Sequence, residues 1–289
     1  MKKRIWSKAV SIFTAILLVV GIVPNTTITA LAAGEDAPNT LYVGNQQVIS
    51  GNDITYWTTD ASEGLGSASG DSWNVKYDPT CATLTLKDAK ISGSYNEYNN
   101  PFTAGIYAQC NSDQSVSLTI ELIGNNNTIT GSYGIYVNAE MDTSIYGTDA
   151  SLTITSEYNG SLEVSGLNHG IFVKSGTGNA SLNIEKATVT SSTNGGYAAG
   201  VNVQSSANAT GSPNISLAVD GGNLTASGTG SSDGILFYVG SSQATGATTS
   251  LTVSENAIVD ARNGGISALK ILETLPTPTP TGDNRSGIV

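Results

Sequence analysis

The sequence has 289 residues, of which only 12% are charged, against about 25% in an average globular domain. It contains 12 Lys and Arg and 23 Asp and Glu, so its formal net charge is −11. A chain this acidic does not favour contact with a phosphate backbone, and we therefore exclude nucleic acid as a partner. Gly, Ser, Thr and Asn supply the polarity instead, which is typical of strands and tight turns rather than helices.

The first 32 residues have the pattern of a secretory signal peptide. A basic start, Met1–Arg4 with Lys8, precedes an uncharged apolar stretch over residues 9–23 and a small-residue cleavage site at Ala30–Ala32. The alternative is a membrane anchor, but this stretch is shorter than the roughly 20 apolar residues that span a bilayer. Cleavage would remove four basic and no acidic residues, leaving a net charge of −15. We expect an exported protein, secreted or cell-wall associated, with no stable membrane span in the mature chain.

Residues 41–77 differ in pattern from the rest of the mature chain and contain both of its tryptophans, Trp57 and Trp73. They lack the repeat found further along. Because the open end of a repeat array exposes strand edges, it needs a cover. We interpret 41–77 as an N-terminal cap segment, with a Gly- and Ser-rich loop over residues 63–71.

The chain has two cysteines, Cys81 and Cys110, separated by nearly one repeat. In an exported protein they can pair, which would close a loop of about thirty residues and stabilise the fold by about 3 kcal/mol. Two buried free thiols are the alternative, and the sequence leaves both open.

A three-part repeat extends over residues 78–272. Each unit begins with an alternating run anchored by a leucine, and the spacings between the anchors are 34, 34, 30, 35 and 34 residues. The third run of each unit starts with Gly followed by Ile or Val. The anchors are Leu84, Leu118, Leu152, Leu182, Leu217 and Leu251, and the glycines are Gly105, Gly134, Gly170, Gly200, Gly234 and Gly265.

Each run alternates with period two, which predicts half-buried β-strands. Since one unit cannot bury its own inner face, stacked units are required. The pattern predicts an all-β solenoid of about six coils, each of three short strands paired in parallel with the next coil. The expected inward columns are the anchors, then Leu86/Ile120/Ile154/Ile184/Val219/Val253, and Ile106/Ile135/Ile171/Val201/Ile235/Ile266.

Residues 273–289 have a different composition, in which Thr and Pro alternate. Such a segment forms no packed element and is predicted to be a stiff extended linker. It is similar to Gram-positive wall-spanning segments. However, Leu275-Pro276 is not followed by the x-Thr-Gly of a sortase signal, so covalent wall attachment is not predicted.

The repeat resembles that of right-handed parallel β-helix proteins of the pectate-lyase-like superfold. The resemblance lies in Ser-Leu-Thr-Ile, an Asn-Gly turn and a Gly-Ile-Tyr-Val strand. The segments Leu41–Gly44 and Tyr77–Leu86 resemble the first part of exported Gram-positive members described as carbohydrate-binding. The resemblance covers about residues 41–269. It implies a right-handed parallel β-helix and a polysaccharide or cell-wall glycan as partner, although the superfold also includes lyases, hydrolases, adhesins and passive stalks.

The candidate glycan site is a column of outward side chains on the third strands, Tyr107, Tyr136, Phe172 and Asn202. Aromatic faces offer rigid apolar area to sugar rings, and an amide can bond their hydroxyls. The alternative is that the stacked rings only stabilise the sheet.

A candidate metal site consists of Glu185 and Asp220, which we expect on adjacent coils about 4.8 Å apart. Such a pair would suit Ca²⁺ or the two carboxylates of a glycoside hydrolase. The calcium-binding G-G-x-G-x-D repeat is absent, basic residues are scattered, and the single His169 sits in a turn. We therefore expect no catalytic residues and no obligatory cofactor. The predicted function is non-catalytic polysaccharide binding by a monomer, with a structural or adhesive stalk as the alternative and a polysaccharide-degrading enzyme third.

Overall fold

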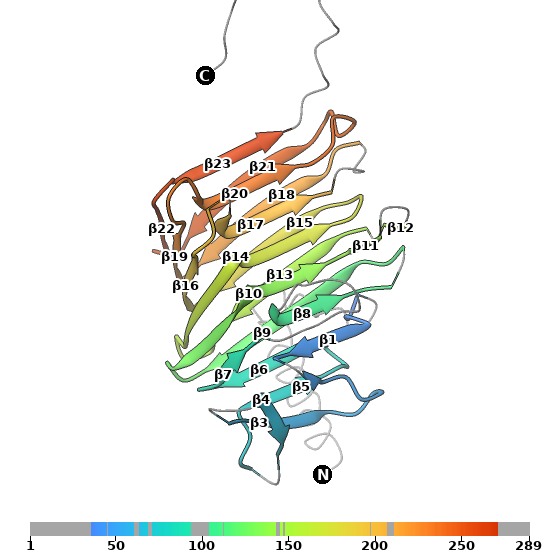
Figure 1. Ribbon diagram of the computed structural model, residues 1–289, viewed down its shortest axis with the longest axis vertical. Helices are drawn as coiled ribbons and strands as arrows, with labels where there is room; N and C mark the ends of the chain where they lie inside the picture. The colour runs from blue at the N-terminus through green and yellow to red at the C-terminus, as the bar shows by residue number, and fades with distance from the viewer. Residues whose placement is uncertain are drawn as a thin grey trace, which may run out of the picture. The chain divides into compact units, whose positions relative to one another are not determined.

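The computed structural model describes residues 36–270, apart from residues 45, 61–63, 69–70, 94–103, 112, 143–144, 147, 197 and 207–210. The predicted signal peptide and Thr/Pro-rich linker lie outside this part. Every regular element within it is a β-strand, so none is a helix that could cross a membrane. Stacked parallel strands form a β-solenoid, as predicted (Figure 1).

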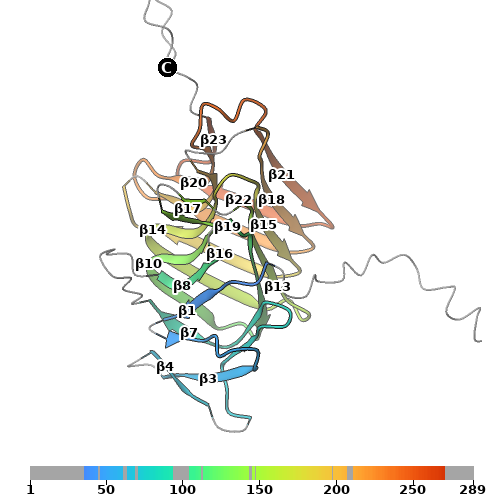
Figure 2. The ribbon, with the colours of Figure 1, turned by 90° about the vertical axis from the view of Figure 1, so that its right-hand side faces the viewer.

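The solenoid has three faces, each a stack of parallel strands. In Figure 2 the first face lies opposite the third, with the second between them. The first face contains β6 (Thr83–Lys87), β9 (Val116–Ile123), β13 (Ala150–Thr155), β15 (Ala180–Glu185), β18 (Asn214–Asp220) and β21 (Thr248–Ser254). The second contains β7 (Lys90–Ser92), the first halves of β10 (Asn127–Asn138) and β14 (Ser161–Ser175), β16 (Thr188–Thr193), β19 (Asn223–Ser227) and β22 (Ile258–Arg262). The third contains β8 (Ala104–Gln109), the second halves of β10 and β14, β17 (Ala199–Ser205), β20 (Asp233–Val239) and β23 (Ile266–Lys270).

The inward columns form the aliphatic core. Leu118, Leu152, Leu182, Leu217 and Leu251 pair in register, and so do the residues two positions after each. Leu152, Ile154 and Ile171 are fully buried. Period-two alternation therefore predicted the orientation of the strands, and the repeat predicted their order.

Three details differ from the prediction. The first coil is shifted by two residues, because Leu84 pairs with Ile120 and Leu86 with Leu122. The solenoid has about five turns rather than the six coils predicted. The second and third runs of two units are joined into the bent strands β10 and β14, with an irregularity between Gly131 and Tyr133.

The Gly that starts each third run is required by close packing of neighbouring coils. A Cβ at Gly170 would lie 2.2 Å from Ser191 Oγ, 2.6 Å from the Gly200 carbonyl oxygen and 2.8 Å from that of Ser192. Gly105, Gly134 and Gly200 are equally close to the carbonyl of the glycine one coil further on. The glycines therefore form a column. At each of them, the backbone of the next coil occupies the space that a side chain would need.

The N-terminal end is closed by antiparallel strands. β5 pairs with β6, and β1 pairs with β8, so two faces of the first coil have a partner on their outer edge. These strands are β1 (Thr40–Val43), β2 (Gln46–Gln47), β3 (Thr55–Asp60), β4 (Gly64–Ser67) and β5 (Val75–Asp78). Two further short strands, β11 (Glu140–Asp142) and β12 (Ile145–Tyr146), pair antiparallel with each other.

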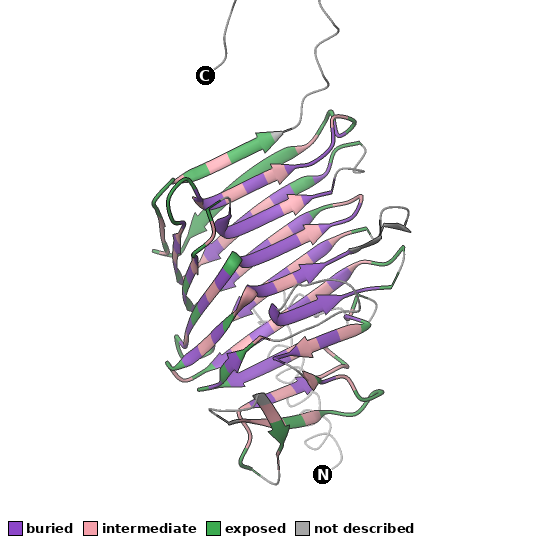
Figure 3. Ribbon diagram, viewed as in Figure 1, coloured by how far each residue is buried: buried purple, intermediate pink, exposed green. Residues whose placement is uncertain are grey.

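The last described coil is open. Five large apolar side chains on it are 37–62% exposed, although three of them occupy inward columns. Figure 3 shows β23 mostly in the exposed colour, and every residue of β21 is exposed. No further strand pairs with β21, β22 or β23 on their outer side within the described residues. The exposed residues are Leu251, Val253, Ile258, Ile266 and Leu269.

Candidate functional site

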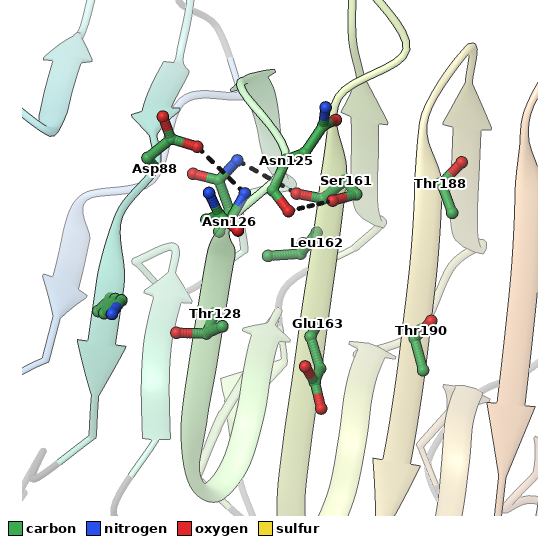
Figure 4. A pocket seen from close by; sticks show the side chains of 11 residues that line it. Asp88, Asn125, Asn126, Thr128, Ser161, Leu162, Glu163, Thr188 and Thr190 are labelled. Atoms are coloured by element: carbon green, nitrogen blue, oxygen red, sulfur yellow. Dashed lines mark hydrogen bonds between the residues drawn. The ribbon is translucent and has the colours of Figure 1, made fainter.

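A polar groove of about 570 Å³ lies on the outer side of the second face, near the N-terminal end. Its floor is a row of side chains in register across four strands, from β7 through β10 and β14 to β16 (Figure 4). Its rim is formed by the corners that lead into those strands. The lining residues are Asp88, Lys90, Asn125, Asn126, Asn127, Thr128, Ser161, Leu162, Glu163, Thr188 and Thr190.

The corners of the groove are held by hydrogen bonds between coils. The buried Asn127 donates from Nδ2 to the carbonyls of Ile123 and Ser161, both at 3.1 Å, and accepts from the Ala89 N–H at 2.9 Å. One side chain thus ties three successive coils together. The Asp88 carboxylate accepts from the Asn126 N–H at 3.1 Å, which fixes the rim.

The floor of the groove presents groups that hydrogen-bond to hydroxyls. The row reads Lys90, Thr128, Glu163 and Thr190, with Thr128 between the ammonium and the carboxylate. Because the side chains repeat at the coil spacing of about 4.8 Å, a polymer lying along the stack meets a new polar group at each coil. Sequence reasoning missed this groove, since its members come from the middle runs and from corners that no motif marks.

The predicted aromatic column forms in the expected register. Tyr107 pairs with Tyr136, Tyr136 with Phe172 and Phe172 with Asn202. The rings stack on one another. Those of Tyr136 and Phe172 are 4.8 Å apart at 15°, and those of Tyr107 and Tyr136 are 5.4 Å apart edge to face.

Two further rings, outside the predicted column, complete this cluster. Tyr133 stacks on Tyr136 at 4.8 Å and on Phe172 at 5.6 Å, and Tyr42 of β1 packs against the same group. As a result Tyr107 is 4% and Phe172 6% exposed. The ring faces are occupied by one another, so the cluster is a second apolar core on the outer side of the third face. The sequence did carry one indication that Tyr133 belongs to this cluster, because Tyr133 stands immediately before the repeat glycine Gly134.

His169 lies within β14 rather than in the turn that was predicted, and it borders this cluster as a half-buried, neutral ring. Its Nδ1 accepts a hydrogen bond from the Ala199 N–H at 2.9 Å, which places the proton of the neutral imidazole on Nε2. Burial lowers its pKa to about 4. The Asn202 Nδ2 lies 3.3 Å from Nε2, and the buried Oδ1 of the same amide has no hydrogen-bond partner. Because Nε2–H is a donor, the amide atom that faces it must be an acceptor. We therefore assign the Asn202 amide the orientation in which Oδ1 accepts from Nε2–H.

The predicted carboxylate pair is brought together, but without a third acidic or imidazole ligand. Glu185 and Asp220 are paired on adjacent coils, and Asp220 accepts from the Ser254 hydroxyl at 2.6 Å. Nowhere in the described part of the chain do three or more His, Cys, Asp or Glu side chains group to hold a metal. Ca²⁺ takes six to eight oxygen ligands, which two carboxylates on a flat strand face do not provide.

The disulfide considered for Cys81 and Cys110 is not formed, and both cysteines are free. Cys81 precedes β6 on the first face, whereas Cys110 follows β8 on the third. A separation of nearly one repeat thus brings them to different faces. The Cys110 thiol donates to the Gln114 carbonyl at 3.0 Å, and burial raises its pKa.

Comparisons of this chain with protein-family models, with curated proteins and with solved structures found no match.

Proposed function

We propose that this protein binds polysaccharide without chemical conversion, at the cell surface or in the secreted fraction. The polymer would lie along the polar groove on the second face. The observation that carries the proposal is the groove itself, in which hydroxyl, amide, carboxylate and ammonium groups line one 570 Å³ depression. That volume falls within the range of about 300–1,000 Å³ typical of ligand sites.

The chemistry of the lining favours binding over hydrolysis. The groove has two carboxylates, Asp88 and Glu163, with the β10 strand between the coils that carry them. A glycosidase needs both carboxyl groups free to act on the substrate, whereas the Asp88 carboxylate already accepts a hydrogen bond from the Asn126 N–H.

A stalk without a glycan site is the second candidate. It is favoured by the aromatic cluster, because rings that stack on one another stabilise the coil rather than a ligand. The two hypotheses differ in what they predict for the groove: a binding protein would bind polysaccharide there, and a stalk would not.

The test is binding of a panel of neutral and acidic wall polysaccharides to the purified full chain by calorimetry. The double variant Thr128→Val and Thr190→Val removes two hydroxyls from the groove floor, and we expect it to weaken binding at least tenfold. Its matched control, Thr119→Val and Thr153→Val, removes two hydroxyls from adjacent coils of the first face and should bind like the parent. Absence of binding by the folded parent, or equal loss in both double variants, would overturn the groove and favour the stalk.

A further inference from the structure

The N-terminal cap and the first strand of the solenoid together place two lysines around one tryptophan on the outer side of the first face. The Lys87 Nζ lies 5.2 Å and the Lys76 Nζ 5.8 Å from the centroid of the Trp73 ring. Tyr56 packs edge to face against the same ring at 6.1 Å and is 43% exposed. Tyr56 of β3 and Lys76 of β5 are direct cross-strand partners, so their side chains lie next to each other.

The backbone beside Trp73 is held firmly, which makes this arrangement a preformed one. The Asn74 N–H donates to the Trp57 carbonyl at 2.9 Å, and the Asn74 carbonyl accepts from the Lys87 N–H at 2.8 Å. The Asn74 side chain donates to the Lys87 carbonyl at 3.0 Å and accepts from the Thr59 N–H at 3.3 Å. Both the tryptophan and one of its lysines are therefore positioned by the same residue.

The charge of this patch is unusual for the chain. The sequence after residue 32 has eight basic and 23 acidic residues, and two of the eight point at one ring. The described residues place no carboxylate within 4.0 Å of either ammonium; the ion pair found there joins Arg262 and Asp260 at the opposite end. The nearby Asp78 carboxylate accepts from the Thr80 hydroxyl at 2.6 Å. The hydrogen bond from Thr80 and, more weakly, the charge of Lys76 lower the pKa of Asp78, so this carboxylate offsets part of the positive charge. Two ammonium groups beside one ring still outnumber the one carboxylate, and this local excess of positive charge favours an anion.

We propose that Tyr56, Trp73, Lys76 and Lys87 form a binding site for an acidic glycan residue. The two ammonium groups would bind its carboxylate or phosphate, and the exposed Tyr56 ring would contact the apolar side of the sugar. The site is distinct from the groove but close to it along the chain, because Lys87 is followed directly by the groove residue Asp88. That the ligand is a sugar rests on the proposed function. That the ligand is an anion is inferred from the two lysines alone.

The experiment measures binding of four polymers to the full chain at low ionic strength. A polyuronate supplies carboxylates, a polyol phosphate supplies phosphates, an uncharged glucan supplies neither, and polyglutamate supplies carboxylates without sugar. Variants are the charge pair Lys76→Gln with Lys87→Gln, the ring change Tyr56→Ser, and the control Lys186→Gln at an exposed site on another coil. We expect at least one acidic glycan to bind, to weaken at least tenfold in the lysine pair and severalfold in Tyr56→Ser, and to be unchanged in Lys186→Gln.

Which acidic glycan binds identifies the anion. The site would be overturned if neither acidic glycan bound, if binding survived the lysine pair, or if polyglutamate bound as tightly and Tyr56→Ser had no effect. Failure of the groove proposal is seen separately, in the Thr128→Val and Thr190→Val variant, which leaves these four residues intact.

Discussion

The middle of the solenoid and its last coil have the same sequence pattern and different surroundings. Leu152 and Ile154 are fully buried, whereas Leu251 and Val253, which stand in the same columns, are 37% and 46% exposed. The middle coil has a neighbour on each side, while the last described coil has one. Alternation along a strand therefore determines which side chains point inward, but burial is supplied by the next coil.

The largest expected effect is at the anchor leucines. Leu152→Ala should lower the free energy of unfolding by about 4 kcal/mol, because it leaves a cavity between two packed coils. Leu251→Ala should cost about 1 to 2 kcal/mol, since its site is already partly hydrated. Denaturant unfolding of both variants measures the difference. Equal costs would mean that the last coil is covered in solution, and the comparison would then fail.

The aromatic cluster extends the comparison to the outer side of the third face. Phe172→Ala removes a ring stacked between Tyr133, Tyr136 and His169 and should cost about 3 kcal/mol. Leu236 occupies the same column two coils later and is half-buried, so Leu236→Ala should cost about 1 kcal/mol. Thermal unfolding followed by near-ultraviolet circular dichroism reports on both. A Phe172→Ala variant as stable as the parent would contradict a stabilising role for the cluster and would favour the predicted ligand site.

The glycine column gives a third matched pair. Gly170→Ala should destabilise by about 2 to 3 kcal/mol, because the new methyl group would meet two carbonyl oxygens that belong to neighbouring backbone. A methyl group on Gly265 would have no atom within 4 Å, and the φ of this residue is +68°, so Gly265→Ala should cost about 1 kcal/mol of backbone strain alone. Urea titration distinguishes the two. A larger loss at Gly265 would contradict the open last coil.

The sequence was sufficient for the repeat and its columns, because leucine and glycine markers recur in independent positions. It was ambiguous for the register of the first coil. A shift of two residues leaves Leu84 and Leu86 both facing inward, so the hydrophobic pattern accepts either pairing. The groove could not be predicted, since it joins residues such as Asp88 and Ser161 whose proximity depends on how the chain turns. The site around Trp73 could not be predicted either, because it depends on the antiparallel pairing of β3, β5 and β6. The aromatic column was predicted, but its burial depends on Tyr42 and Tyr133, which lie outside the column's repeat position.

The smallest expected effect concerns the protonation of His169, which the packing of the middle coils disfavours. His169 is the single histidine of the chain and stands in register with Ala199 and, one coil further, with Asp233, which bonds the Ser267 hydroxyl at 2.6 Å. Desolvation of this half-buried ring lowers its pKa to about 4, below the ordinary value of 6.5. Above pH 6.5 neither the folded nor the unfolded chain binds the proton. As the pH falls from 6.5 towards 4, only the unfolded chain does, so stability declines over that window.

The expected loss is about 2 kcal/mol between pH 8 and pH 5, from the linkage between proton binding and folding. Urea unfolding at both pH values measures it, and the variant His169→Gln isolates it from the titration of carboxylates. The difference between parent and variant should change by that amount over the interval. A constant difference would mean that His169 takes up its proton in the folded chain, because water then reaches this part of the third face. The middle coils would in that case be as open as the last one, and the contrast between the two regions would be lost.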